Sequence, residues 1–289
     1  MSNTTSSILL ATDLSPRSDR ALDRAVQIAL ARNARLVVLH VVEPSLVEPL
    51  ANKPWHHNAP DPRTLAEQRL RRDLGGTPVQ IDVVIAHGKA VDLIHTTAAQ
   101  HHCELIVTGT ARDETLGRVL LGTTVEKLVR ISDIPVLVVK NRPHGNYGHA
   151  VLTTDFSEGS RAAIRAAFKL LPEVPYTLFH SYATPLGPTK EGATQAGARA
   201  ITERDGTAFL ANTPELAGKS LSDIVLAEGQ PELAIARHVA EHEEVDLVVT
   251  GTHGRTGILR TALGSVADFM IERLPADLLV VRQPHTVKR

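Results

Sequence analysis

Three glycines and a serine near the C-terminal end of the chain have the spacing of an anion-binding loop. Gly251, Gly254 and Gly264 precede Ser265 in the order G-x2-G-x9-G-S. The apolar stretch 247–250 predicts a buried parallel strand before the loop, and the residues from Ser265 onward predict a helix with that serine as its N-cap. Helix starts carry backbone N–H groups without intrahelical partners, and glycines let a phosphate approach the backbone. The spacing therefore indicates a phosphate site, with an ordinary strand–helix loop as the alternative.

The same arrangement occurs twice in the chain. The segment 8–15, ILLATDLS, recurs as 150–157, AVLTTDFS, and the offset from Asp13 to Asp155 is 155 − 13 = 142 residues. The pairs Gly109 and Gly251, and Gly122 and Gly264, keep this offset. A period of this length is too long for a solenoid, so each copy should have its own core.

We predict two domains, residues 1–140 and residues 150–289, with 141–149 as the linker. In copy one the expected strands are 7–12, 36–42, 79–85, 105–108 and 136–140. The expected helices of copy one begin at 15–16 and then cover 63–74, 91–100 and 123–131, the last with Thr123 as its N-cap. In copy two the expected strands are 151–154, 177–180, 222–227, 247–250 and 278–281. The expected helices of copy two are 161–171, 199–211, 231–241 and 265–274.

Strands that alternate with helices predict a parallel α/β sheet with right-handed crossovers and helices on both faces. In such sheets, ligands bind beyond the carboxyl ends of the strands. Hydrophobic residues make up 43% of the chain and aromatic residues only 3%, so the core should consist of aliphatic side chains. The composition is that of a globular α/β protein.

Charge and sequence motifs narrow the expected partners. The formal net charge is −1, which gives no electrostatic case for nucleic acid or a membrane surface. No segment predicts a signal peptide or a membrane span, and the single cysteine, Cys103, fits a reducing compartment. We therefore expect a cytoplasmic protein. The H-x-x-E-H string at 238–242 is expected to be a polar helix end, so no metal site is predicted.

The glycine pattern, together with the words GTHGRTG and LGSVA, resembles the universal stress protein family. The resemblance implies two tandem doubly wound domains, each with a five-stranded parallel sheet in the order 3-2-1-4-5. It also implies that the last strands of the two domains pair antiparallel, so that the chain forms an intrachain pseudo-dimer; a homodimer stays open. Many members bind ATP with this loop, which makes an adenine nucleotide, with or without Mg²⁺, the expected ligand.

The resemblance implies an ATP site in copy two. Its residues would be Thr153, Thr154, Asp155, Ser181, Thr250, Gly251, Thr252, His253, Gly254, Gly264, Ser265 and Val266. Asp155 would accept a hydrogen bond from the amino group of adenine, or alternatively cap the following helix. The backbone at Ser181 would contact the base, and the loop glycines would surround ribose and phosphates.

Copy one departs from the pattern and predicts a degenerate site. Its corresponding residues are Thr12, Asp13, Gly109, Arg112, Gly122 and Thr123. Arg112 replaces the second loop glycine and should crowd the phosphates, and Asp113 and Glu114 would repel them. The alternative is that Arg112 turns inward and binds phosphate itself.

The predicted function is a stress-response protein that binds ATP as a regulatory ligand in its C-terminal domain. The sequence supplies no clear general base or metal cage, so we expect slow ATP hydrolysis at most. Two alternatives stay open: a nucleotide-dependent enzyme on the same α-hydrolase-like scaffold, and an interaction module whose pockets are both empty.

Overall fold

The computed structural model describes residues 6–16, 18–42, 61–110, 114–115, 118–119, 122–183, 195–252 and 264–283. The first half of the chain contains β1 (Ser7–Thr12), α1 (Ser18–Ala31), β2 (Arg35–Val42), α2 (Pro62–Asp73), β3 (Ile81–His87), α3 (Ala90–Gln100), β4 (Cys103–Gly109), β5 (Glu114–Thr115), β6 (Arg118–Val119), α4 (Thr123–Ile131) and β7 (Val136–Val139). The second half contains β8 (Ala150–Thr153), α5 (Glu158–Leu170), β9 (Tyr176–Tyr182), α6 (Gln195–Ala211), β10 (Ile224–Glu228), α7 (Pro231–Glu241), β11 (Leu247–Gly251), α8 (Ser265–Arg273) and β12 (Asp277–Val281).

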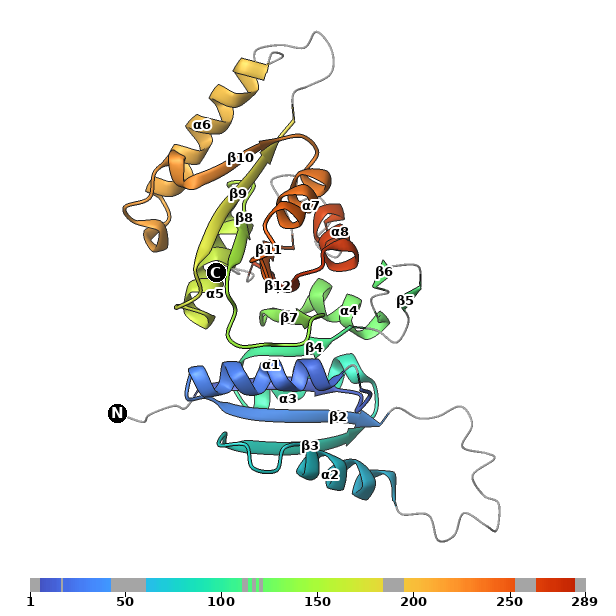
Figure 1. Ribbon diagram of the computed structural model, residues 1–289. Coiled ribbons are helices and arrows are strands. Elements are labelled where there is room, and N and C mark those ends of the chain that lie inside the picture. The colour runs from blue at the N-terminus through green and yellow to red at the C-terminus, as the bar shows by residue number, and fades with distance from the viewer. Residues whose placement is uncertain are drawn as a thin grey trace, which may run out of the picture.

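The main strands form one ten-stranded sheet in the order β10-β9-β8-β11-β12-β7-β4-β1-β2-β3 (Figure 1). Counted within each half, the order is 3-2-1-4-5, as the family resemblance implied. Within this sheet, all strand pairs inside a half are parallel. The mixed α/β fold with helices on both faces of the sheet is therefore confirmed.

In the described parts of the chain, four helices cover each face of the sheet. One core cluster contains side chains of α1, α2, α5 and α6, and the other contains side chains of α3, α4, α7 and α8. Alternate strand residues feed the two clusters: Ile8 and Leu10 belong to the first, and Leu9 belongs to the second. This alternation follows from the two-residue period of a strand and explains why the strands are apolar throughout.

The two halves meet where β7 and β12 pair antiparallel at the centre of the sheet (Figure 1). The register pairs Val138 with Leu278 and Leu137 with Leu279. Every residue of both strands is buried. Helices α4 and α8 lie beside each other at this junction, where Arg130 of α4 approaches Asp268 of α8 at 3.9 Å.

The helix starts at the two glycine loops differ from the prediction. Thr123 and Ser265 were expected as N-caps, but the N-caps are Gly122 and Gly264, in extended conformation and without a side-chain cap hydrogen bond. Both helices therefore start one residue earlier than side-chain capping preference indicates. In the second half the N–H of Gly264 also donates to the carbonyl of Thr252 at 3.1 Å. The β5–β6 hairpin of the first half was not predicted.

Within the described parts of the chain, none of the helices has the length and apolar character that crossing a membrane requires.

Candidate functional site

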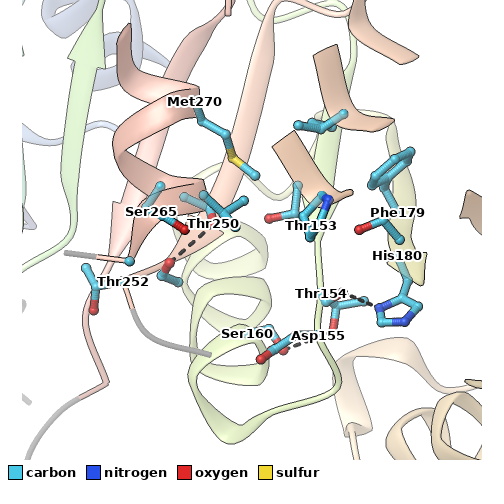
Figure 2. A pocket seen from close by; sticks show the side chains of 17 residues that line it. Thr153, Thr154, Asp155, Ser160, Phe179, His180, Thr250, Thr252, Ser265 and Met270 are labelled. Carbon is cyan, nitrogen blue, oxygen red and sulfur yellow. Dashed lines mark hydrogen bonds between the residues drawn. The ribbon is translucent and has the colours of Figure 1, made fainter. Parts of the chain in front are cut away.

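A pocket of about 310 Å³ lies at the carboxyl ends of β8, β9 and β11 (Figure 2). β8 and β11 are neighbouring strands, and the helices that follow them, α5 and α8, cover opposite faces of the sheet. The pocket therefore lies at the topological switch point of the second half. The predicted site residues that the structure describes all line it: Thr153, Thr154, Asp155, Ser181, Thr250, Gly251, Thr252, Gly264, Ser265 and Val266. His253 and Gly254 lie outside the described residues.

A tight turn after β8 holds Asp155 at the sheet edge. The Oγ1 atom of Thr154 accepts the N–H of Phe156 at 2.9 Å, and Oδ1 of Asp155 accepts the N–H of Ser157 at 3.1 Å. Phe156 is in the left-handed region with φ 63°, a strained conformation that this turn must stabilise. Ser157, and not Asp155, is the N-cap of α5, because its Oγ accepts the N–H of Ser160. Asp155 is therefore a partly buried carboxylate on the pocket wall.

Gly251 at the end of β11 is required for packing as well as for the loop. A Cβ there would lie 3.1 Å from the carbonyl carbon and oxygen of Gly159 and 3.4 Å from the nitrogen of Ser160. All three atoms belong to the backbone of the first turn of α5, so a side chain would force the helix away from the strand. The absence of a side chain lets α5 and β11 enclose the pocket together.

Three helix starts surround the pocket. Ser160 of α5, Pro231 of α7 and Ser265 of α8 line it, and each lies in the first turn of its helix. The helix dipole is positive at the start of each helix, so the pocket favours an anion. Ser265 Oγ donates to Glu232 at 3.2 Å, which places one carboxylate at the α7–α8 edge of the site.

On β9, sequence analysis predicted Ser181 but missed two other residues that line the pocket. Phe179 and His180 line the pocket, and Nδ1 of His180 lies 2.7 Å from the carbonyl oxygen of Thr154. Because a carbonyl only accepts, Nδ1 carries the proton in this bond. The His180 ring stacks on Phe156 with centroids 4.1 Å apart. The remaining lining residues that were not predicted are Ser160, Pro231, Ile235, Ala267 and Met270.

A histidine pair lies behind the Phe179 wall. The His238 ring contacts Phe179 and His242, with centroids 5.0 Å and 4.2 Å away. Burial, followed by the charge of His242, lowers the pKa of His238, which favours its neutral form. His242 Nδ1 lies 2.8 Å from the carbonyl oxygen of His238, which occupies one ring nitrogen within the helix end. Among the residues that the structure describes, no group of three or more His, Cys, Asp and Glu side chains could hold a metal ion.

The predicted degenerate residues of the first half occupy the equivalent places. Thr12 ends β1 and Asp13 follows it, Gly109 ends β4, Gly122 is the N-cap of α4, and Thr123 is the first residue of α4. Arg112 lies outside the described residues, as do its neighbours 111 and 113.

Comparison with known proteins identifies the family. The profile of the universal stress protein family matches residues 4–140 and again 146–282. A universal stress protein of Mycolicibacterium smegmatis is 28% identical in an alignment 306 positions long, which covers 95% of this chain and 96% of that protein. A universal stress protein of Thermus aquaticus is 32% identical over 136 residues, which cover 46% of this chain and 97% of that protein.

A solved structure has the same fold over the whole chain. The crystal structure of a universal stress protein from Archaeoglobus fulgidus superposes with a TM-score of 0.66 at 17% identity, covering 98% of this chain and all, 100%, of that one. The two profile matches correspond to the two halves of the ten-stranded sheet, β1–β7 and β8–β12. The chain belongs to the universal stress protein family, as a tandem pair of its domains.

Proposed function

We propose that this protein binds ATP as a regulatory ligand in the pocket of its second half. The observation that carries the proposal is the convergence of the predicted residues on one pocket at the switch point. These residues come from three strand ends and one helix start. The pocket volume, about 310 Å³, is at the lower end of the range for small-molecule sites, before the loop 253–263 is counted.

The chemistry of the lining fits the parts of ATP. Asp155 supplies an acceptor for the amino group of adenine, and the backbone at Ser181 lies on the same side of the pocket. The start of α8 supplies backbone N–H groups for phosphates. His253 and Gly254 would complete the phosphate loop, and a Mg²⁺ ion that accompanies ATP would be held chiefly by phosphate oxygens.

We propose binding without rapid hydrolysis. Among the described residues, Asp155 is the acidic side chain that lines the pocket, and its Oδ1 accepts the N–H of Ser157; Glu232, at the α7–α8 edge, accepts from Ser265 Oγ. A general base must instead contact the attacking water. Two alternatives stay open: a nucleotide-dependent enzyme on this scaffold, and an interaction module with empty pockets. The experiment below distinguishes both from a regulatory site.

The proposal places the protein in the cytoplasm, as its reduced, buried Cys103 suggests. It also treats the two halves as an intrachain pseudo-dimer, which the antiparallel β7–β12 pair supports. A further homodimer would need another surface.

Mass spectrometry of ligand released from purified protein tests the proposal. We expect ATP close to one equivalent per chain, and none from a Gly264→Val variant. That variant is a sharp control because a Cβ at Gly264 already lies 3.3 Å from the carbonyl oxygen of Thr252. Released product in place of ATP, with turnover of added ATP, would favour an enzyme. No ligand and no calorimetric binding of ATP would favour the interaction module.

A further inference from the structure

Two of the three helices that begin at the pocket, α5 and α8, end against residues of the first half of the chain. Helix α8 begins at Ser265 beside the pocket and ends at Arg273. Lys140, the residue that follows β7, donates from Nζ to the carbonyl of Met270 at 3.0 Å and to that of Leu274 at 2.8 Å. The first half therefore supplies a cationic cap for the helix on which the second half would hold phosphate. Met270 belongs to both regions, because its side chain lines the pocket.

Lys140 is buried at the junction between the halves and is held there by several hydrogen bonds. The residue is only 5% exposed, its own N–H donates to Asp277 Oδ1 at 2.8 Å, and its carbonyl accepts from Arg20 Nη1 at 2.7 Å. Asp277 also accepts from Tyr147 Oη at 2.8 Å, and Arg24 Nε approaches it at 3.7 Å. The charged and titratable neighbours of Lys140 are thus one acid on β12, two arginines on α1 and the linker tyrosine.

A second cation from the first half caps α5, another helix that starts at the pocket. Arg32, just after α1, donates from Nη1 to the carbonyls of Lys169 and Leu170 at 2.6 and 3.1 Å. These are the last two residues of α5. Glu104 holds the same guanidinium at 2.9 Å. Both α5 and α8 therefore carry a cation from the first half at the C-terminal end and face the pocket with the N-terminal end.

The opposite cap provides a natural comparison. Arg282 stands where Lys140 stands, one residue after the last strand of its half, and its Nη1 donates to the carbonyl of Ile131 at 2.8 Å. Ile131 is the last residue of α4, whose start belongs to the first half. Arg282, from the second half, thus caps the corresponding helix of the first half, and it does not line the pocket of the second half.

We propose that Lys140 is a positioning residue for the nucleotide pocket, through which the first half sets the affinity of the second half for ATP. The inference rests on the proposed function. A cation at the C-terminal end of a helix and an anion at the N-terminal end are both favoured by the same dipole. The helix of nine residues separates the two charges by about 13 Å, a distance at which attraction is modest inside a protein. By linkage, ATP should also tighten the contact between the halves.

If the charge of Lys140 acts on the pocket, ATP affinity should depend on pH, which a purely steric role of the side chain would not produce. Burial lowers the pKa of Lys140 to about 8, against a smaller opposing effect of Asp277. Above that pH the folded protein loses the cation while the unfolded chain keeps it to its usual pKa of 10.5. ATP affinity should therefore fall as pH rises through about 8. The contribution of Lys140 to the free energy of unfolding should rise over the same interval, because the unfolded state then binds more protons.

Calorimetry with ATP on three variants of the full chain tests the inference. Lys140→Met removes the cation and keeps the length of the side chain, and we expect ATP affinity to weaken by about threefold to tenfold. Lys140→Arg keeps a permanent cation, so it should restore most of the affinity and remove the decline above about pH 8. Arg282→Met, the matched control, should bind ATP as the wild type does.

The outcomes separate the inference from the function on which it rests. Equal ATP affinity and equal pH profiles for wild type, Lys140→Met and Lys140→Arg would overturn the positioning role and leave ATP binding intact. Equal weakening by Arg282→Met would overturn it as well, because any junction damage would then suffice. If Lys140→Met does not fold, as checked by chemical denaturation, the Lys140→Arg profile decides. Absence of ATP binding by the wild type overturns the proposed function and the inference together.

Discussion

The turns after β1 and β8 show how alike the two halves are. Thr12 Oγ1 accepts the N–H of Leu14 at 3.0 Å, as Thr154 Oγ1 accepts the N–H of Phe156 at 2.9 Å. Leu14 and Phe156 have φ of 59° and 63°. Both halves therefore use the same strained turn to bring an aspartate to the carboxyl edge of the sheet. A motif that recurs with this fidelity belongs to the fold and does not identify a ligand site by itself.

The next turn of chain distinguishes the halves. In the first half the Ser18 hydroxyl donates to the Asp13 carboxylate. In the second half the equivalent Ser160 hydroxyl bonds to Thr154 Oγ1 at 2.9 Å and to the carbonyl of Ser157 at 3.0 Å. The comparison teaches that one fold can direct the same carboxylate differently through the start of a single helix.

Cutting the chain at the linker should have the largest effect, because it breaks the contact that unites the halves. Residues 1–140 would expose β7 and residues 150–289 would expose β12, each an apolar strand that is buried in the full chain. An exposed apolar edge strand promotes association. We expect each half to aggregate or to form a homodimer in size-exclusion chromatography with light scattering. Two soluble, monomeric halves would contradict the pseudo-dimer.

Gly251→Ala should disturb the second half next. The added Cβ would lie 3.1 Å from the backbone of Gly159, which has no flexible side chain to move aside. We expect a loss of about 1–3 kcal/mol in the free energy of unfolding by urea denaturation, together with weaker ATP binding. Gly148→Ala is the control, because its Cβ would have ordinary contacts at 3.7 and 3.8 Å and should change stability by less than about 0.5 kcal/mol. A stable Gly251→Ala protein would show that α5 and β11 can separate.

Replacing the aspartate of each turn by alanine should have the smallest effect. The two variants test whether Asp155 and Asp13 differ in function. Asp155→Ala removes the acceptor for the amino group of adenine, and we expect ATP affinity to fall by about tenfold. Asp13→Ala should leave ATP affinity unchanged, since the proposed site lies in the other half. Competition between ATP and a labelled adenine nucleotide measures both. Equal losses in the two variants would mean that both halves bind.

Local patterns predicted the order of strands and helices well. Apolar runs such as 136–140 and 247–250 marked strands to within one or two residues, because a parallel strand between two helical layers is apolar on both sides. The repeat then assigned the strand ends, and with them Asp155 and Gly251, to one edge of the sheet. The N-caps were less predictable, since Thr123 and Ser265 are by residue type the better capping residues, whereas the N-caps of α4 and α8 are Gly122 and Gly264.

Contacts between distant segments were beyond the sequence. His180 reaches the pocket because Thr153 pairs with Phe179 in the β8–β9 register, where the offset from the first half is 180 − 40 = 140 residues rather than 142. The gapless alignment of the glycine loops gave no sign of that shift. Lys140 lies 130 residues from its acceptor Met270, and no spacing rule links them. Such contacts follow from how the two halves join.

Calorimetric titration with ATP tests the central claim, that the two halves share a fold and differ in their ligand site. We expect a stoichiometry near one ATP per chain. Gly264→Val, whose side chain would crowd the Thr252 carbonyl oxygen, should abolish binding, and the matched change Gly122→Val in the first half should leave it intact. Two equivalent sites per chain, or binding that is lost with Gly122→Val and kept with Gly264→Val, would contradict the account.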